Sequence, residues 1–327
     1  MKRVCVTGSS GFIGTHLVRR LKAEGYWVRG VDVKLPEFAP FAGDDLLLSD
    51  LRDPDPAQVA LADVDAVYHL ACEMGGIGFT LPHSFDQRLT NSRIDQNVAA
   101  AVREQRVERV FFASSACVYN ETLQAEVTAW PLTEEDAYPA QPDLSYGWTK
   151  LMGEQLLQDL AHDTQVGIRI FRFHNVYGEL GAWDGGREKA PAALCRKVAL
   201  AKLRGDDHIT IWGDGEQQRS FMYVDDCVEG IRRLMDSTYA HPLNLGRDDA
   251  VSINTLARLI MDVAGYECAI EHDLSQPQGV RARNSDNSRL REVLGWTPQI
   301  DLRAGLERTY PWIEQRVTEK YGEQTHV

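Results

Sequence analysis

The sequence predicts an α/β fold in which a doubly wound parallel sheet is joined to a smaller, discontinuous α+β domain in the C-terminal half. Two observations predict it. Over the first half of the 327 residues, short apolar runs of strand length alternate with stretches of helical periodicity, as in sheets covered by helices on both faces. Beyond about residue 176 the pattern becomes glycine-rich and irregular, which indicates a second structural unit.

The individual elements follow from these runs. Strands are expected at 4–7, 27–33, 45–48, 65–70, 109–113, 166–172 and 242–245. The first helix follows the first strand, because Ile13, Leu17 and Leu21 repeat every four residues. Further helices are expected at 84–105, 145–163, 190–203, from 225 onward and at 302–320. Residues 120–144 are polar and contain three prolines, so we expect a long loop of the kind that often serves function.

The helix from 225 and the strand at 242–245 are expected to return to the main sheet. We therefore predict a sheet domain made of residues 1–175 and 224–248. The smaller domain would combine residues 176–223 and 249–327. The chain length suits such a division.

Composition excludes several classes of protein. Hydrophobic residues make up 43% and charged residues 25%, which is typical of globular proteins and excludes a disordered or coiled-coil chain. No apolar run approaches the ~20 residues of a membrane helix. Asp and Glu outnumber Lys and Arg by 48 to 35, and the resulting net charge of −13 disfavours nucleic acid and anionic membranes as partners.

The six cysteines are scattered, without a C-x-x-C pair or a histidine at metal-ligand spacing. No metal site is therefore expected. Reduced thiols indicate a cytoplasmic protein. The strand-like run that starts at Val4 leaves no room for a signal peptide, which favours the same location.

A glycine trio joins the first strand to the first helix. Gly8 permits a tight turn, Gly11 lets a pyrophosphate approach the backbone, and Gly14 lets the helix pack closely on the sheet. The helix N-terminus then offers free N–H groups to phosphate. Asp32, 18 residues beyond Gly14, can accept hydrogen bonds from the adenosine ribose and would repel a 2′-phosphate. These features predict a Rossmann-type site that prefers NAD to NADP.

The candidate catalytic pair opens the helix expected at 145–163. Tyr146 and Lys150 are four residues apart and share one helix face, where an ammonium stabilises a phenolate and lowers the tyrosine pKa. Such a tyrosine can take a proton from a sugar hydroxyl while a hydride leaves to nicotinamide. Ser114 and Ser115 end the preceding strand and can hydrogen-bond to the same oxygen. The predicted cofactor contacts are Gly8, Gly11, Phe12, Ile13, Gly14, Asp32, Asp50, Leu51, Tyr146 and Lys150.

This arrangement resembles the extended short-chain dehydrogenase/reductases over essentially the whole chain. Six strings narrow the resemblance to the GDP-mannose 3,5-epimerase family: ACEMGGIGF at 71–79, SSACVY at 114–119, RFHNVYG at 172–178, GGREKAPA at 185–192, WGDGEQQRSF at 212–221 and GVRARNSD at 279–286. The string around Lys189 and the cysteine at 117 are the most specific. The resemblance implies an isomerase with NAD as cofactor, a GDP-sugar as substrate and a homodimeric assembly.

The chemistry of such an enzyme can be reasoned independently. Oxidation of sugar C4 to a ketone turns C3 and C5 into α-positions whose carbanions become enolates. One group must then remove a proton, and another on the opposite face must return one. The resemblance implies that Cys117 and Lys189 form this pair, while Tyr146 and Ser115 could hold the enolate charge. The predicted catalytic residues are Tyr146, Lys150, Ser115, Cys117 and Lys189.

The resemblance also implies the substrate contacts. A diphosphate is best bound by guanidinium forks, and Arg219 and Arg281 stand where the family binds it. The implied substrate-binding residues are Gly75, Ser115, Cys117, Asn175, Glu188, Lys189, Ala190, Lys197, Gln217, Arg219, Ser220 and Arg281. The roles of Arg187, Arg283 and His174 stay open, and a preference for guanine rests on the resemblance alone.

Several activities remain as alternatives. Inversion at C5 alone would give GDP-L-gulose, and inversion at both C5 and C3 would give GDP-L-galactose. A sugar-nucleotide 4-epimerase or 4,6-dehydratase would also use NAD but would not need Cys117 with Lys189. A non-enzymatic dinucleotide sensor would need neither that pair nor Tyr146 with Lys150.

Overall fold

The structure, a computed structural model, describes residues 1–128 and 130–322. A seven-stranded sheet forms the larger lobe in the order β11-β6-β5-β4-β1-β2-β3, and each neighbouring pair is parallel. The strands are β1 (Arg3–Thr7), β2 (Trp27–Asp32), β3 (Asp45–Leu48), β4 (Ala66–His69), β5 (Arg109–Ser115), β6 (Gly167–Phe173) and β11 (Pro242–Leu245). The order reverses at β1 and β4, which is where ligands bind in open parallel sheets. The predicted fold class is confirmed.

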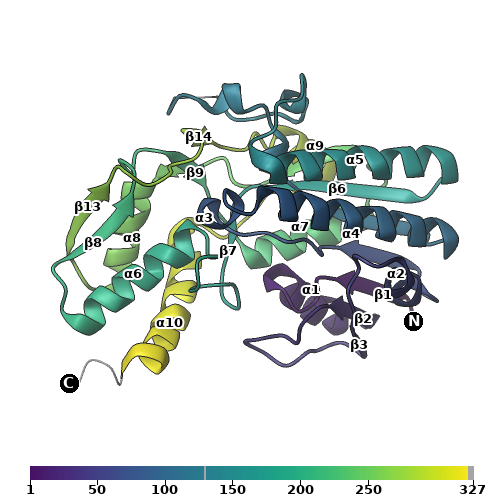
Figure 1. The fold of residues 1–327 in the computed structure, drawn as a ribbon, viewed down its shortest axis with the longest axis horizontal. Coiled ribbons are helices and arrows are strands. Elements are labelled where there is room, and N and C mark those ends of the chain that lie inside the picture. The colour runs from purple at the N-terminus through teal and green to yellow at the C-terminus, as the bar shows by residue number, and fades with distance from the viewer. Residues whose placement is uncertain (129, 323–327) are drawn as a thin grey trace.

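Helices cover both faces of this sheet (Figure 1). One face carries α2, α4 and α5, and the other carries α1 and α7. Their bounds are α1 (Phe12–Ala23), α2 (Pro54–Leu61), α4 (Ser84–Glu104), α5 (Leu144–Thr164) and α7 (Val224–Asp236). Side chains of β1 alternate between the two faces, as strand geometry requires. Cys5 packs in the core that includes Leu157 of α5, whereas Val4 and Val6 pack in the core that includes Leu17 of α1.

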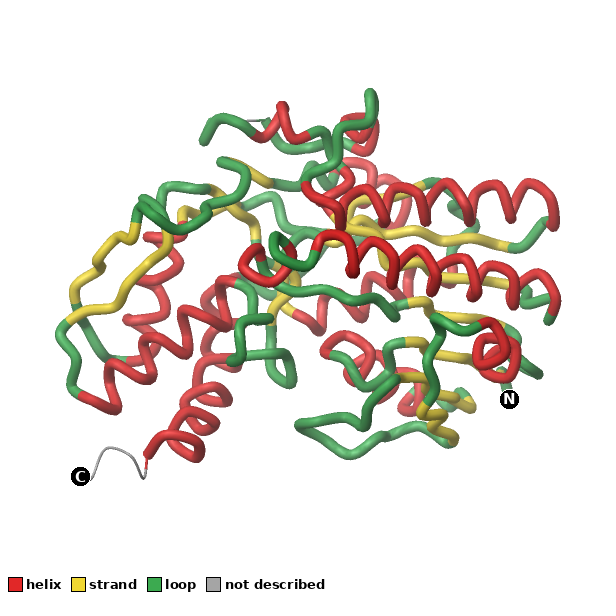
Figure 2. The backbone as a smooth tube through the Cα atoms, viewed as in Figure 1, coloured by secondary structure: helices red, strands yellow, loops and turns green. Residues whose placement is uncertain are grey.

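The smaller lobe is built from short strands and helices of the C-terminal half, with α6 packed between α8 and α10 (Figure 2). Its strands pair as β13-β8, β12-β9-β14 and β10-β7. The strands are β7 (Val176–Tyr177), β8 (His208–Trp212), β9 (Gln218–Ser220), β10 (Met222–Tyr223), β12 (Ala250–Ser252), β13 (Ala269–Asp273) and β14 (Ala282–Arg283). Its helices are α6 (Ala190–Arg204), α8 (Ile253–Ala264) and α10 (Leu302–Tyr321). Two short helices contact the sheet lobe instead: α3 (Ile77–Thr80) contacts α5, and α9 (Ser288–Leu294) contacts β11.

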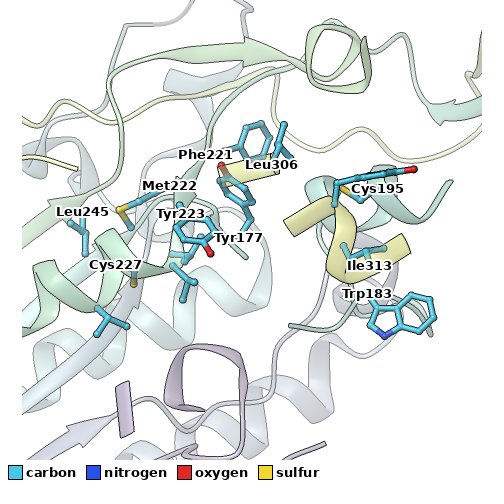
Figure 3. Packing of buried hydrophobic residues seen from close by; sticks show 14 of the residues in the cluster. Tyr177, Trp183, Cys195, Phe221, Met222, Tyr223, Cys227, Leu245, Leu306 and Ile313 are labelled. Atoms are coloured by element: carbon cyan, nitrogen blue, oxygen red, sulfur yellow. The ribbon is translucent and has the colours of Figure 1, made fainter. Parts of the chain in front are cut away.

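A continuous apolar core joins the two lobes (Figure 3). Tyr177 and Tyr223 pack edge to face in this core, with ring centroids 5.8 Å apart. The Tyr177 hydroxyl donates to the carbonyl of Leu302 at 3.0 Å, at the start of α10. A Cβ at Gly305 would come within 2.0 Å of that hydroxyl oxygen, so the close approach of α10 requires glycine there.

The connections between elements are more regular than expected. The loop expected at 120–144 contains two short 3-10 helices, Glu121–Gln124 and Glu134–Ala137, and a third, Ala116–Val118, precedes it. The division of the chain into two domains stays a proposal: a sheet domain of residues 1–175 and 224–248, and a smaller domain of residues 176–223 and 249–327. Residues 129 and 323–327 lie outside the described residues. Among the described residues, no helix combines the length and apolarity needed to cross a bilayer.

Candidate active site

The glycine turn after β1 has the geometry of a phosphate-binding turn. Gly8 adopts a left-handed φ of +71°, and a Cβ at Gly14 would meet the Gly8 carbonyl oxygen at 2.1 Å, so both positions need glycine. The side-chain hydroxyls of Ser9 and Ser10 are buried without a hydrogen-bond partner. The first turn of α1 has no acidic residue and no side-chain cap, which leaves its N–H groups and positive dipole end free. These features fit a dinucleotide diphosphate.

The carboxylate at the end of β2 is fixed by the same turn. Asp32 Oδ2 accepts a hydrogen bond from the Ser10 backbone N–H at 3.0 Å, and Oδ1 accepts from the Lys34 N–H at 3.2 Å. The carboxylate of Asp50 is instead engaged by Arg52, whose Nη2 lies 2.5 Å from Oδ2, and this hydrogen bond holds the Asp50 pKa below its ordinary value. Leu51 is buried against the sheet.

Tyr146 and Lys150 lie one turn apart near the start of α5, where the helix packs closely on the segment that follows β5. A Cβ at Gly147 would lie 2.1 Å from the carbonyl oxygen of Cys117, so glycine lets α5 pack directly on the 3-10 helix that follows β5. Lys150 is 1% exposed, and its Nζ lies 5.9 Å from the Tyr146 ring centroid and 4.8 Å from that of Phe112. The ammonium is thus held beneath the tyrosine ring by the core.

In the protein alone, other influences outweigh the lowering of the Tyr146 pKa that is expected from Lys150. Burial raises the Tyr146 pKa well above its ordinary value, and the charges of Cys72 and Cys117 act in the same direction. The influence of Cys72 on the phenol is the largest of any neighbouring side chain. Two thiols, rather than one, therefore flank the tyrosine.

Cys117 follows Ser115 at the end of β5. Ser115 Oγ accepts a hydrogen bond from the Cys117 backbone N–H at 3.1 Å and caps the 3-10 helix. Cys117 Sγ accepts from Nη1 of Arg283 at 3.2 Å. The same guanidinium donates from Nη2 to Asp143 and from Nε to Gln124, each at 2.7 Å.

Lys189 reaches the cleft from the smaller lobe. It is the residue that caps the N-terminus of α6, and its side chain is exposed toward the cleft. The surrounding protein lowers the Lys189 pKa, while the charges of Cys117 and Cys72 oppose this shift. The three residues therefore share one electrostatic environment.

Two sequence-derived candidates turn away from this site. The prediction that Ser114 and Ser115 both donate to the sugar oxygen does not fit Ser114, because its hydroxyl donates to Glu154, which also forms a buried ion pair with Arg172 at 2.7 Å. His174 is a core histidine whose Nε2 lies 2.9 Å from Asn244 Oδ1. Burial lowers the His174 pKa to about 3, so the ring is neutral. Both residues belong to the core beneath the cleft.

The candidate substrate residues form a second cluster around β9. The side-chain oxygens of Gln217 (Oε1) and Ser220 (Oγ) are buried without a partner, and Asn175 Nδ2 donates to the Ser220 carbonyl at 3.0 Å. Arg219 lies near Arg283, and burial together with that charge lowers the Arg219 pKa to about 9. Arg219 is half-buried, and its Nη1 and Nη2 donate to the carbonyls of Gln218 at 2.7 Å and Val280 at 2.6 Å. A cation held by neutral carbonyls beside a second guanidinium suits an anionic ligand.

Other candidate substrate residues have protein partners. Lys197 Nζ donates to the Thr210 carbonyl at 2.6 Å, and Arg281 Nη1 lies 3.0 Å from Asp214 Oδ1. Glu188 is paired with Arg196 at 2.8 Å. Gly75 belongs to the segment before α3, where a Cβ would come within 2.7 Å of Phe79. Ala190 is the first residue of α6.

Sequence reasoning missed Cys72 and Asp143, and it named Arg283 without a role beside Cys117. Cys72 follows β4 and is fixed between two anchored neighbours: Ala71 N donates to Thr7 Oγ1 at 3.1 Å, and Glu73 N donates to Asn91 Oδ1 at 2.7 Å. The place of Cys72 just beyond a strand's carboxyl end was a usable signal.

Comparisons with known proteins identify relatives of this chain. The model of the NAD dependent epimerase/dehydratase family matches residues 4–246. GDP-mannose 3,5-epimerase 1 of Oryza sativa subsp. indica is 42% identical over 96% of this chain and 82% of that protein. GDP-mannose 3,5-epimerase of Arabidopsis thaliana is 41% identical over 99% and 85%.

Solved structures share the fold. UDP-glucose 4-epimerase of Thermotoga maritima superimposes with a TM-score of 0.86 at 24% identity, over 96% of this chain and 99% of that one. MoeE5, solved with UDP-glucuronic acid and NAD, gives a TM-score of 0.83 at 29% identity, over 96% and 99%.

Proposed function

The chain belongs to the NAD-dependent epimerase/dehydratase family and uses NAD, and from this premise we propose that it is an epimerase of GDP-mannose. It inverts C5 and C3 of the mannosyl group through a transient 4-keto sugar and releases GDP-L-galactose. GDP-L-gulose is the product when C5 alone is inverted. The observation that carries the proposal is that the charge of Cys117 acts on both Tyr146 and Lys189, which come from different lobes.

The cofactor is held by the turn and the carboxylate described above. The N–H groups at the start of α1 and the Ser10 hydroxyl face the diphosphate, and Asp32 takes the adenosine ribose. When bound, NAD accepts a hydride from sugar C4 and returns it at the end, so no net oxidation occurs. Tyr146 takes the proton of the C4 hydroxyl and gives it back in the last step.

Inversion is the task of the cysteine and the lysine. Once C4 is a ketone, one of the two removes a proton from the neighbouring carbon, and the other delivers a proton to the opposite face. Each inversion conserves atoms, because the proton removed is replaced by one proton. Lys189 is exposed as a residue, but the surrounding protein displaces water from its amine and lowers its pKa, which lets this side chain act as either acid or base nearer neutrality than an ordinary lysine.

The enolate and the diphosphate each need positive or donor groups. Tyr146 and Ser115 supply hydrogen bonds near the C4 oxygen. Arg219, half-buried beside Arg283, gains a counter-charge when the diphosphate binds, and Arg281 can exchange Asp214 for phosphate. The unpartnered side-chain oxygens of Gln217 and Ser220 support a polar ligand at β9.

The test is a product analysis in deuterated water. Wild-type protein with NAD and GDP-mannose should incorporate deuterium at C5 and C3. Label at C5 alone identifies the single epimerase, and absence of label at both carbons contradicts the proposal. Cys117→Ala and Lys189→Ala should each still exchange hydride with the cofactor but fail to invert the sugar, whereas both variants of a 4-epimerase would stay active.

We also propose that the protein is a cytoplasmic homodimer. The six cysteines are free thiols, which suits a reducing compartment. α4 and α5 lie side by side on one face of the sheet (Figure 1) and expose large apolar side chains, among them Phe85 of α4, 76% exposed, and Met152 of α5, 54% exposed. Apolar side chains at such exposure favour a second copy as partner. Sedimentation should give a dimer, and Phe85→Glu should weaken it.

A further inference from the structure

We propose that Arg187 is a positioning residue for Lys189, acting as a latch that holds the loop of residues 184–189 across the cleft. Its guanidinium carbon lies 4.0 Å from the ring centroid of Phe79, and its Nη2 lies 3.4 Å from Oε1 of Glu73. Both partners belong to the opposite wall of the cleft, residues 73–80. The meaning of this latch for catalysis rests on the proposed function, in which Lys189 transfers protons.

The loop is anchored at both ends and held in its middle by Arg187. Asp184 accepts hydrogen bonds from Lys320 Nζ at 2.7 Å and from the Tyr321 hydroxyl at 2.6 Å, and Glu188 is paired with Arg196. Between these anchors, Gly185 and Gly186 adopt φ values of +90° and +86°, and a Cβ at either would meet no atom within 4 Å. This stretch is exposed and unpacked, so it has room to move.

The wall that receives the latch is rigid. The backbone of Glu73 is tied to α4, because its N–H donates to Asn91 Oδ1 at 2.7 Å and its carbonyl accepts from Asn91 Nδ2 at 3.0 Å. The two walls also touch through their backbones, since a Cβ at Gly76 would lie 2.9 Å from the Glu188 carbonyl oxygen. Through Glu73, Arg187 therefore fixes the position of Lys189, two residues further along the chain, relative to α4.

The strength of the latch suits repeated opening. The Arg187 side chain is 51% exposed and that of Glu73 is 29% exposed, so water and salt weaken the ion pair. A sugar nucleotide has to pass between these walls before Lys189 can meet the sugar. Closure after entry would then complete the proton-transferring pair, as loop closure does in many enzymes.

A matched control lies elsewhere in the chain. Arg308 of α10 pairs with Asp225 at 3.2 Å, lies 5.3 Å from the Tyr223 ring centroid, and is also 51% exposed. It has the same combination of carboxylate and aromatic ring but joins no cleft walls. The effect of Arg308→Ala on exchange, kcat and thermal stability therefore measures the contribution of an exposed arginine that does not contact residues 73–80.

The first experiment measures amide hydrogen exchange in the NAD-bound protein without substrate. Arg187→Ala and Glu73→Gln should each speed exchange in the peptide covering 183–190 by roughly tenfold. Arg308→Ala should leave that peptide unchanged. Equal exchange rates in the wild type and the Arg187→Ala variant overturn the latch, whatever the substrate of the enzyme is.

The second experiment links the latch to inversion. Arg187→Ala should lower kcat for inversion by roughly ten- to a hundredfold, with a thermal midpoint equal to that of Arg308→Ala. Arg187→Lys should retain part of the kcat that Arg187→Ala loses. The double variant with the charges exchanged, Arg187→Glu with Glu73→Arg, should have a higher kcat than either of its single variants. Kinetic constants equal to those of Arg308→Ala overturn the positioning role. A wild type that does not invert GDP-mannose contradicts the proposed function and leaves the exchange result to decide the latch.

Discussion

Arg283 Nη1 donates a hydrogen bond to the sulfur of Cys117 at 3.2 Å. The guanidinium cannot easily leave this place, because Asp143 and Gln124 each accept from it at 2.7 Å and the residue is 8% exposed. The pair links β14 of the smaller lobe to the end of β5 in the sheet. The candidate proton-transferring thiol therefore has a fixed cation beside it.

Replacing that cation should slow reactions of the Cys117 sulfur. Burial alone would lower the Arg283 pKa, but the charges of Cys117 and Asp143 outweigh burial and raise that pKa, so the guanidinium stays charged beside the sulfur. Arg283→Gln should therefore reduce alkylation of Cys117 by iodoacetamide by roughly tenfold at pH 7. Peptide mass spectrometry over time gives the rate for this cysteine alone. Arg303→Gln, an exposed arginine of α10, is the control. An unchanged rate in Arg283→Gln would mean that the cation does not act on the sulfur.

A second prediction concerns Cys72 and the pH dependence of the oxidation step. The charge of Cys72 raises the pKa of Tyr146, so Cys72→Ala should lower that pKa. Formation of reduced cofactor, followed at 340 nm after mixing with substrate, should then reach half its maximal rate at a lower pH than in the wild type. Cys268→Ala, a thiol far along the chain in the smaller lobe, should leave the profile in place. A shift upward, or none, would show that Cys72 does not influence the phenol.

The predictable part of the site is local in sequence. The glycine turn and the pair Tyr146 and Lys150 follow from spacing within one turn or one helix, and the structure has them as expected. Ser114 and Ser115 show the limit, because neighbours on a strand point to opposite sides and the sequence does not say which side holds the site. Ser114 enters the core and Ser115 caps the next turn.

The remaining part depends on contacts between distant segments. Arg283 is 166 residues from the cysteine it contacts and 140 from Asp143. No periodicity or spacing reports such a pairing, since it arises from how β14 is placed beside the end of β5. The place of Cys72 beside Tyr146 likewise follows from the crossover that brings β4 next to β5.

The third prediction tests cofactor selectivity. Asp32→Ser should weaken NAD binding by roughly tenfold or more, because a charge-assisted hydrogen bond to the ribose is lost, and should strengthen NADP binding, because repulsion of the 2′-phosphate is removed. Thermal midpoints with each cofactor at equal concentration give the comparison. Asp53→Asn is the control, since this exposed carboxylate makes no side-chain cap to α2. Unchanged preference for NAD would assign selectivity to other residues.

The last prediction concerns Asp184, which anchors the loop that carries Lys189. Burial alone would raise its pKa, but hydrogen bonds from Lys320, Tyr321 and the Gly185 N–H outweigh burial and lower the pKa from 3.8 to about 2. A carboxylate whose pKa is lower in the folded than in the unfolded state stabilises the fold at pH values above its unfolded-state pKa. This contribution is lost as the pH falls toward its folded-state pKa.

Asp184→Asn should therefore reduce the free energy of unfolding by roughly 1 kcal/mol at pH 6, a discount from the full shift because Lys320 is 54% exposed. The deficit should shrink between pH 4 and pH 2 and be small at about pH 2, because about half of the wild-type carboxyl groups are then protonated. Urea unfolding at pH 6, 4, 3 and 2 measures it. Lys320→Met should reproduce part of the deficit at pH 6. A deficit that is constant with pH would mean that Asp184 acts through shape and hydrogen-bond geometry rather than through its charge.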